Sequence, residues 1–402
     1  MFLFLDFFST FENNFGTSMK ICFICPEYPE GPHGGIGTLI QILSREFVKN
    51  GHEVRVIGIY PKNYPGPNYE SDMGVRVWRL RSGKWKFGWV IPYFKQYKII
   101  KQWAEKSEID IVEAPDSRGW YTFWPKMHIP LILRANGSNL YFSQILNSKL
   151  SRLTSFMERK SYLRADGIIS ASKYTATLVR EIIGPQKKIE IIYNGINLPT
   201  LSNEIVRDNN KVLFTATLIR KKGIFQFLEA IKILIHKKIE FVVDIYGKDT
   251  IDETVGSVKS YIQKMIPPGY ENKIKIKDQI SREDLAIVYQ KGTVAVFPSF
   301  AEAFAMAPLE AMVCNCPVIN TNLGSGSEFI ENNIDGILID PNDPNEISDA
   351  IERILTNRDF ASMIGQNGRN KVLQNFLVDR MIHKSLAFYL QIIDNAKNLD
   401  NG

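Results

Sequence analysis

Two glutamates with seven residues between them stand where a predicted strand gives way to a helix. The apolar run at residues 294–298 predicts the strand, and Glu302 follows it in a loop. We place Pro308 at the first position of the next helix, which puts Glu310 in its first turn. Two carboxylates can accept hydrogen bonds from hydroxyl groups, and the alanines between them leave the backbone amides open to a ligand. Glutamates that only balance the helix dipole give the same pattern, so both interpretations stay open.

Two further loops could each bind an anion. The basic loop 220–223 reads Arg-Lys-Lys-Gly at a predicted helix start, where cations oppose the helix dipole and an anionic partner is favoured. The loop 34–37 reads Gly-Gly-Ile-Gly and presents bare backbone N–H groups at another helix start. Neither has the spacing of a dinucleotide fingerprint or of a P-loop. A solvated basic turn and a tight glycine turn remain the alternatives.

One supersecondary unit occurs twice and would position these loops. Residues 20–60 and residues 211–247 both read as strand, loop, helix and strand. Open parallel sheets bind ligands at the carboxyl ends of their strands, where both loops fall. Further strand-like runs lie at residues 110–114, 131–135, 166–171, 190–194, 273–277, 294–298, 317–321 and 336–340. The sequence therefore predicts an α/β protein of two Rossmann-like domains with parallel sheets, facing each other across a cleft.

The alternation of strands and helices also predicts the domain limits. Residues 194–210 are rich in Asn and turn formers and predict the linker. We expect a first domain at residues 19–198, a second at residues 199–376, and a last helix in residues 377–402 that packs back on the first domain. The strand pattern begins only after Met19, so we expect residues 1–18 to be an upstream start or a disordered extension, and not a secretory signal.

Composition narrows the class of protein less than the motifs do. The 49 basic and 43 acidic residues permit an anionic ligand, a nucleic acid or an acidic membrane surface. No apolar run reaches about 18 residues, so we expect no membrane span. Cys22 and Cys25 lie three apart in a strand and face opposite sides, while the other two cysteines are distant, so we expect reduced thiols and no metal site.

From Met19 to about residue 390, the chain resembles the retaining glycosyltransferases of family 4, which have the two-domain architecture called GT-B. The strongest segment is EAFAMAPLEAM, residues 302–312, which resembles that family's E-x7-E motif. The resemblance is supported by ERKSYLRADGIISAS, by IIYNGIN, by the Lys222-Gly223 loop and by CPVINTNLGSGSEFIENNIDGILIDP. It implies a metal-independent, cytoplasmic enzyme without a separate cofactor, which moves a sugar from a UDP or GDP sugar to a glycan or lipid-linked acceptor in surface polysaccharide biosynthesis.

The resemblance also implies a role for each matching residue. Glu302 would bind hydroxyls of the donor sugar, and Glu310 those of the ribose. Arg220 takes the place of an arginine that many relatives carry where this chain has Ala216-Thr217. The residues implied to bind the donor are Gly35, Arg220, Lys222, Phe304, Met306, Ala307 and Glu310. The candidate catalytic residues are Glu302, Asn136 and Asp116.

Asn136 departs from the family pattern, because relatives often have a histidine at this place near the reacting sugar. An asparagine can donate a hydrogen bond but does not titrate. A non-catalytic nucleotide-sugar-binding protein would explain this asparagine and remains an alternative to glycosyl transfer. A nucleotide-sugar 2-epimerase remains a second alternative, because those enzymes share the two-domain plan.

Candidate residues on the acceptor side come from the first domain. His33 precedes the glycine loop, and Asp116 and Arg118 follow the strand-like run 110–114; each could instead be a solvated loop residue. Residues 83–103 interleave five lysines with aromatic side chains, which suits a peripheral contact with the inner face of a membrane or with a lipid acceptor. An amphipathic helix that covers the first sheet, with its lysine ammonium groups kept in water, would give the same composition. No nucleic-acid partner is expected, because no binding motif accompanies it.

Overall fold

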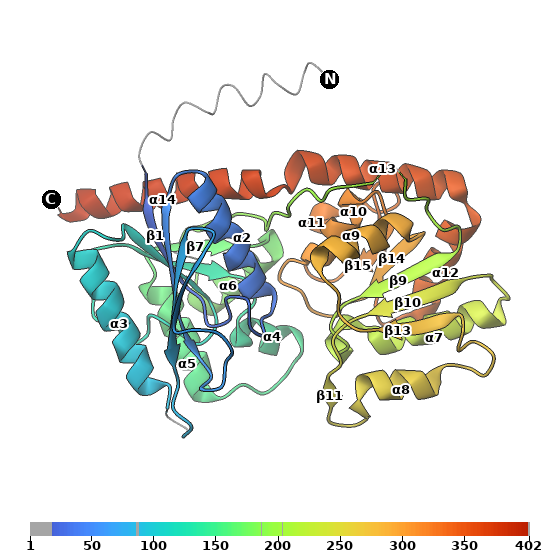
Figure 1. The fold of residues 1–402 in the computed structure, drawn as a ribbon, viewed down its shortest axis with the longest axis horizontal. Coiled ribbons are helices and arrows are strands. Elements are labelled where there is room, and N and C mark those ends of the chain that lie inside the picture. Colours follow the sequence, from blue (N-terminus) through green and yellow to red (C-terminus); the bar gives the residue numbers. More distant parts are fainter. Residues whose placement is uncertain (1–17, 86–87, 186, 203, 401–402) are drawn as a thin grey trace, which may run out of the picture.

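A computed structural model describes residues 18–400 except residues 86–87, 186 and 203. Two α/β domains lie next to each other along the long axis, and the last two helices run across both of them (Figure 1). The predicted extension at residues 1–18 falls, apart from residue 18, outside the described residues.

The first domain is built on an eight-stranded sheet with the order β3-β4-β2-β1-β5-β6-β7-β8, in which all neighbouring strands are parallel except β3 and β4. Its strands are β1 (Lys20–Ile24), β2 (Glu53–Tyr60), β3 (Tyr69–Asp72), β4 (Val75–Arg81), β5 (Ile111–Pro115), β6 (Leu131–Ala135), β7 (Gly167–Ser170) and β8 (Ile189–Ile191). The strand-like runs that we predicted here all overlap strands, but β8 ends at Ile191, so only residues 190–191 of the predicted run 190–194 belong to it. The hairpin of β3 and β4 was not predicted.

Helices cover both faces of this sheet. They are α2 (Gly35–Lys49), α3 (Val90–Glu105), α4 (Asn139–Ile145), α5 (Arg152–Arg164) and α6 (Lys173–Ile183). Cys22 packs in the core on the face of α3, and Cys25 packs in the core on the face of α2. The two thiols thus face opposite sides of β1, as a strand requires. All four cysteines are buried and free.

The second domain has a six-stranded, fully parallel sheet with the order β13-β10-β9-β14-β15-β16. Its strands are β9 (Lys211–Thr215), β10 (Val242–Tyr246), β13 (Ile274–Lys277), β14 (Val294–Phe297), β15 (Val318–Thr321) and β16 (Ile337–Ile339), with a separate short hairpin of β11 (Ile251–Asp252) and β12 (Gly256–Ser257). Its helices are the 3-10 turn Arg220–Lys222, α7 (Ile224–His236), α8 (Val258–Met265), α9 (Arg282–Lys291), α10 (Met306–Val313), α11 (Gly326–Phe329), α12 (Pro344–Thr356) and α13 (Arg358–Asn375). Both parallel sheets and their facing arrangement confirm the predicted fold class.

The last helix, α14 (Val378–Asp400), leaves the second domain and joins the core of the first. Its Tyr389 hydroxyl donates to the carboxylate of Glu113 in β5. Glu113 also accepts from the Arg134 guanidinium of β6 at 2.6 Å, and all three side chains are buried. A buried ion pair needs such extra hydrogen bonds to offset its loss of hydration. The C-terminal helix therefore completes a buried polar network with β5 and with β6, the strand that leads to Asn136.

No helix in the described part of the chain is long and apolar enough to cross a membrane.

Candidate functional site

A cavity of about 590 Å³ lies between the two domains, where the carboxyl ends of the two parallel sheets meet. Ligands of open α/β sheets bind at this edge. Of the predicted site residues, the cavity is lined by His33, Gly35, Asn136, Lys222, Glu302, Phe304, Met306, Ala307 and Glu310. It is not lined by Asp116, Arg118 or Arg220.

The basic loop presents two lysines to this cavity. Gly223 ends the 3-10 turn with φ +73°, and a Cβ there would lie 1.9 Å from the carbonyl oxygen of Pro298. Glycine is therefore required for the turn to approach the end of β14. Lys222 forms an ion pair with Glu302, and both side chains are largely buried. The two residues implied to bind diphosphate and sugar thus hold each other in this conformation.

Lys221 is the second cation in the cavity, and the sequence did not single it out. Its ammonium lies 4.4 Å from the ring centroid of Phe142, which belongs to the first domain. Burial lowers the pKa of Lys221, and the neighbouring Lys222 lowers it further, while Glu302 opposes the shift. An anion between these lysines would relieve their repulsion.

Arg220, which we predicted to bind the donor, points elsewhere. Its Nε donates to Asp252 at 2.6 Å, and its guanidinium lies over the ring of Phe225. The 3-10 turn sends consecutive side chains in different directions, so the arginine faces the short β11–β12 hairpin and Lys221 takes the place towards the cavity.

The N-terminus of α10 is the strongest anion site that the backbone offers. The helix begins at Met306 without a side-chain cap or an acidic residue in its first turn. Its free amides therefore carry the positive end of the helix dipole into the cavity. Our placement of Pro308 was wrong: it is the third helical residue, a position where the missing N–H costs no intrahelical bond. Glu310 consequently lies beyond the first turn.

Glu310 lies at the end of the cavity next to α9. Burial raises the pKa of its carboxyl group, and the guanidinium of Arg282, 3.1 Å away, partly opposes this shift. Arg282 also lines the cavity. A carboxylate that is paired with an arginine at a largely enclosed position is suited to accept hydrogen bonds from hydroxyl groups.

Asn136 faces the cavity from the first domain, at the end of β6. Its Oδ1 accepts a hydrogen bond from Nδ2 of Asn194, 3.3 Å away, which also lines the cavity. This contact orients the amide of Asn136, so that its N–H groups can serve as donors.

Asp116 lies beneath this loop and is buried. Its Oδ2 accepts from the backbone N–H of Gly137 at 3.2 Å and from the Tyr162 hydroxyl at 2.9 Å. Burial raises its pKa to about 7. Instead of lining the cavity, Asp116 anchors the loop that carries Asn136. Arg118 lies nearby, with its guanidinium over the ring of Trp120.

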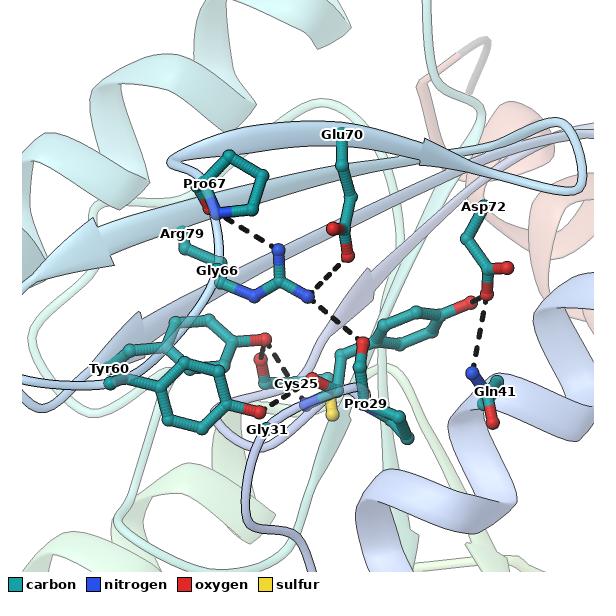
Figure 2. A network of polar contacts seen from close by, with 12 residues as sticks. Cys25, Pro29, Gly31, Gln41, Tyr60, Gly66, Pro67, Glu70, Asp72 and Arg79 are labelled. Atoms are coloured by element: carbon teal, nitrogen blue, oxygen red, sulfur yellow. Dashed lines mark hydrogen bonds and ion pairs between the residues drawn. The ribbon is translucent and has the colours of Figure 1, made fainter.

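The loop after β1, which leads to the glycine loop, is held by side chains of β2 and β4 (Figure 2). The Tyr60 hydroxyl donates to the carbonyl oxygen of Cys25 at 2.7 Å. Arg79 in β4 donates to the carbonyl oxygen of Pro29 at 2.9 Å and pairs with Glu70 of β3. The unpredicted β3–β4 hairpin therefore positions the glycine loop at the cavity.

A carboxylate already occupies the glycine loop. Oε1 of Glu27 accepts from the backbone N–H of Gly37 at 2.9 Å, within the first turn of α2. A Cβ on Gly37 would lie 2.0 Å from the carbonyl oxygen of Glu27, so this close approach needs glycine. A Cβ on Gly35 would meet no other atom within 4 Å. Nδ1 of His33 donates a hydrogen bond to the carbonyl oxygen of Gly31. Because Glu27 adds negative charge here, α10 is the better anion site of the two helix ends.

Hydroxyl groups of the first domain hold the loop that carries Glu302. The Tyr141 hydroxyl donates to the carbonyl oxygen of Glu302 at 2.8 Å. Ser172 and Thr175, at the start of α6, donate to the carbonyl oxygen of Ala303 at 2.8 and 3.1 Å. All three hydroxyl groups therefore fix the backbone just before the amides of α10.

A fourth contact joins the domains beside this one. Glu328 of α11 accepts from the backbone N–H groups of Lys173 and Tyr174, both at 2.7 Å. It thereby binds the N-terminus of α6, where a carboxylate is favoured by the helix dipole.

Sequence reasoning missed several residues that this geometry brings in. Lys221 stood in the basic loop that we had noted, but only the folded chain shows which of its side chains face the cavity. Arg282, Glu27 and Asn194 gave no separate signal. In the part of the chain that the structure describes, no group of three His, Cys, Asp or Glu side chains could hold a metal ion.

Replacing Asp116 with Asn should flatten the pH dependence of stability. The folded carboxyl has a pKa of about 7 against an ordinary value of 3.8, so the folded state binds more protons than the unfolded state between these values. The free energy of unfolding therefore falls as the pH rises from about 4 to 7, by up to about 4 kcal/mol from this group. Chemical denaturation across this range measures the effect. If the free energy of unfolding changes equally with pH in the wild type and in Asp116→Asn, the raised pKa of Asp116 is wrong.

Two family models match successive parts of the chain: Glycosyltransferase Family 4 at residues 33–199 and Glycosyl transferases group 1 at residues 201–371. Among curated proteins, an uncharacterized glycosyltransferase of Methanocaldococcus jannaschii is 26% identical over 92% of this chain and 98% of its own length. The O-antigen chain mannosyltransferase C of Escherichia coli is 21% identical over 94% of this chain and 100% of its own length.

Solved structures agree on the fold. Sucrose-phosphate synthase from Thermosynechococcus elongatus superposes with a TM-score of 0.78 at 19% identity, over 94% of this chain and 100% of that one. The Anabaena protein HepE, in complex with UDP and glucose, superposes with a TM-score of 0.73 at 17% identity, over 93% of this chain and 99% of that one. With both sheets and the matched segments in place, the chain belongs to the family 4 glycosyltransferases and has the GT-B fold.

Proposed function

We propose that this glycosyltransferase moves a sugar, with retention, from a UDP or GDP sugar to a glycan or lipid-linked acceptor in surface polysaccharide biosynthesis. The observation that carries the proposal is that Lys222, Glu302, the open end of α10 and Glu310 all line one cavity. Glu302 suits the sugar of such a donor, Lys222 and the open end of α10 suit the diphosphate, and Glu310 suits the ribose.

The donor is assigned to the second domain. The diphosphate lies against Lys222 and the amides of Met306 and Ala307, where a cation and a helix N-terminus act together. Glu310 accepts from the ribose hydroxyls. Glu302 gives up part of its pairing with Lys222 and accepts from hydroxyls of the sugar.

The transfer breaks the bond between the sugar C1 and the diphosphate oxygen and forms a bond from C1 to the acceptor oxygen on the same face. The acceptor's proton passes to the departing diphosphate. Lys221 and Lys222 stabilise the negative charge that develops there, and the rigid cavity orients the two reactants. Asn136 donates a hydrogen bond near the reacting sugar, and Asp116 positions it from below. Gly35 and His33 line the cavity from the first domain.

The proposed acceptor and setting are supported by the relatives. One relative is a mannosyltransferase of the O-antigen chain. We place this enzyme in the cytoplasm at the inner face of the membrane, where lipid-linked glycans are built, and assign it no metal or separate cofactor.

Incubation of the protein with UDP and GDP sugars, with nucleotide release followed over time, tests the function. Glycosyl transfer requires an acceptor for sustained release. An epimerase converts the UDP sugar with no acceptor added, and a binding protein is stabilised by the nucleotide without turnover. If no nucleotide or nucleotide sugar raises the melting temperature, the donor assignment is wrong.

Replacing Lys222 with Met should weaken UDP binding by about tenfold to a hundredfold, because hydrogen bonds to charged groups are worth about 1.5–3 kcal/mol. Lys237→Met is the matched control, since Lys237 pairs with two surface carboxylates, Asp349 and Glu352, outside the cavity. Isothermal titration measures both affinities. Unchanged affinity in Lys222→Met, or an equal loss in the control, speaks against this assignment.

Replacing Tyr141 with Phe should weaken donor binding about twofold to tenfold, because it removes one hydrogen bond, worth about 0.5–1.5 kcal/mol, that holds the Glu302 loop. Tyr121→Phe is the control: its hydroxyl donates to the carbonyl of Ile132 inside the first domain, at the same 2.8 Å. Both variants should lose some stability, but only Tyr141→Phe should lose affinity. An equal loss of donor affinity in both variants would show that the Tyr141 hydrogen bond between the domains does not position the Glu302 loop for the donor.

A further inference from the structure

We propose that helix α5, the loop 117–126 and the start of α3 form a docking face for a membrane that contains anionic lipids. We call these three segments the basic apolar face. The proposal places this membrane contact on α5, a helix that the sequence did not mark as a membrane contact, and it does not depend on which nucleotide sugar the cavity binds.

Helix α5 exposes large apolar side chains that a soluble surface would not need. Leu153 is 57% exposed, Phe156 54% and Leu163 42%. They recur at intervals of three and seven residues and therefore share one side of the helix. The opposite side carries Met157 and Tyr162 into the domain.

The exposed side of α5 is basic as well as apolar. Arg152, Arg159 and Lys160 are all exposed and flank or interrupt the apolar row. The one carboxylate of the helix, Glu158, is buried and accepts from Asn139 at 2.7 Å. A helix with this division of charge and apolar surface lies in the plane of a membrane interface.

The loop 117–126 continues the same surface towards α3. Thr122 donates to the carbonyl of Met157 in α5 at 2.6 Å, and the backbone N–H of Phe123 donates to the Tyr93 hydroxyl of α3 at 3.2 Å. Phe123 itself is 47% exposed between them. The loop therefore joins the two helices into one surface.

Helix α3 adds apolar groups and lysines where it begins. Ile91 is 70% and Phe94 43% exposed, and the neighbouring Lys95 and Lys98 are exposed too. The helix buries Tyr93 and other side chains against the sheet, so the predicted covering helix and an outward apolar edge occur together. Lys86 and Phe87 of the predicted lysine-aromatic stretch lie outside the described residues.

The charge of these segments is far from that of the whole chain. Residues 90–98, 117–126 and 152–164 together contain eight basic residues and one acidic residue, Glu158, whereas the chain has 49 and 43. Such a concentration attracts an anionic surface, and lysine and arginine can keep their charges at the lipid head groups while their stems contact apolar groups.

The residue types favour a membrane over other partners. Stacking on single-stranded nucleic acid uses aromatic rings, whereas Ile91, Leu153 and Leu163 are aliphatic. The cores of protein interfaces are depleted in lysine, which is abundant here. An anionic lipid surface uses both the aliphatic groups and the cations.

The basic apolar face also leads to the cavity. Phe142 lines the cavity, and the chain runs from it through Leu146, which is 42% exposed, and Lys149 to the start of α5. Given the proposed function, a lipid-linked acceptor held in the bilayer would present its head group on the first-domain side of the cavity.

Sedimentation with lipid vesicles tests the docking face. The whole protein should sediment with vesicles of phosphatidylcholine mixed with phosphatidylglycerol, and should stay in solution with phosphatidylcholine alone. The double variant Leu153→Glu/Phe156→Glu should bind the anionic vesicles at least about tenfold more weakly, because it removes apolar contact and adds like charge. Added salt should also weaken binding by the wild type.

The double variant Val206→Glu/Ile251→Glu is the matched control, because these side chains are 83% and 80% exposed on the second domain. It should bind vesicles as the wild type does, and both double variants should retain the wild-type affinity for UDP. A wild type that stays in solution with anionic vesicles, or an α5 variant that still binds them, overturns the proposal. Binding of a single-stranded RNA oligonucleotide in place of vesicles overturns it too. Vesicle binding without any affinity for UDP would instead remove the proposed function and leave the docking face intact.

Discussion

The carbonyl oxygens of Glu302 and Ala303 receive hydrogen bonds from the hydroxyl groups of Tyr141, Ser172 and Thr175 in the other domain. These bonds lie one turn before the open end of α10, so they set the direction of the amides that face the cavity. Hydrogen bonds from one domain thus hold a loop of the other in its observed position. The site is therefore a property of the paired domains, and the shared helix α14 and the Glu328 contact serve the same end.

The charges of the cavity are divided unequally between the domains. The second domain contributes Lys221, Lys222 and the uncapped end of α10, whereas the first contributes Glu27 at the end of α2. A negatively charged donor is therefore favoured on the second domain, and the first domain is left with the polar, uncharged Asn136 and the deeply buried Asp116. The ion pair of Lys222 with Glu302 restrains both side chains in positions that a bound donor can use.

Most of the fold could be predicted because strands of parallel sheets are buried on both faces and form short, continuous apolar runs. The β3–β4 hairpin escaped notice because β3 is a short, polar edge strand and β4, next to it, alternates buried apolar residues with more exposed ones that include arginines. Among the site residues, the segment from Glu302 to Glu310 was recognisable because its two glutamates have the spacing of a family motif and small residues lie between them. The start of α10 was misplaced, since a proline fits any position of a first turn.

The remaining differences depend on tertiary packing that no local pattern contains. Whether Arg220 or Lys221 faces the cavity depends on the rotation of one 3-10 turn against β14 and on the nearby Asp252. Asp116 follows a strand like many solvated loop residues, but the chain of α5 folds over it and buries it. Residues such as Asn194 come to the cavity from a distant strand end.

A crystal structure of the protein with UDP bound is the most direct measurement of the central claim, that the second domain holds the donor. The account predicts the diphosphate within hydrogen-bond distance of Lys222 and of the first amides of α10, with the ribose hydroxyls on Glu310. UDP bound outside the cavity, or with its diphosphate on the glycine loop of α2 and away from Lys222, would contradict it.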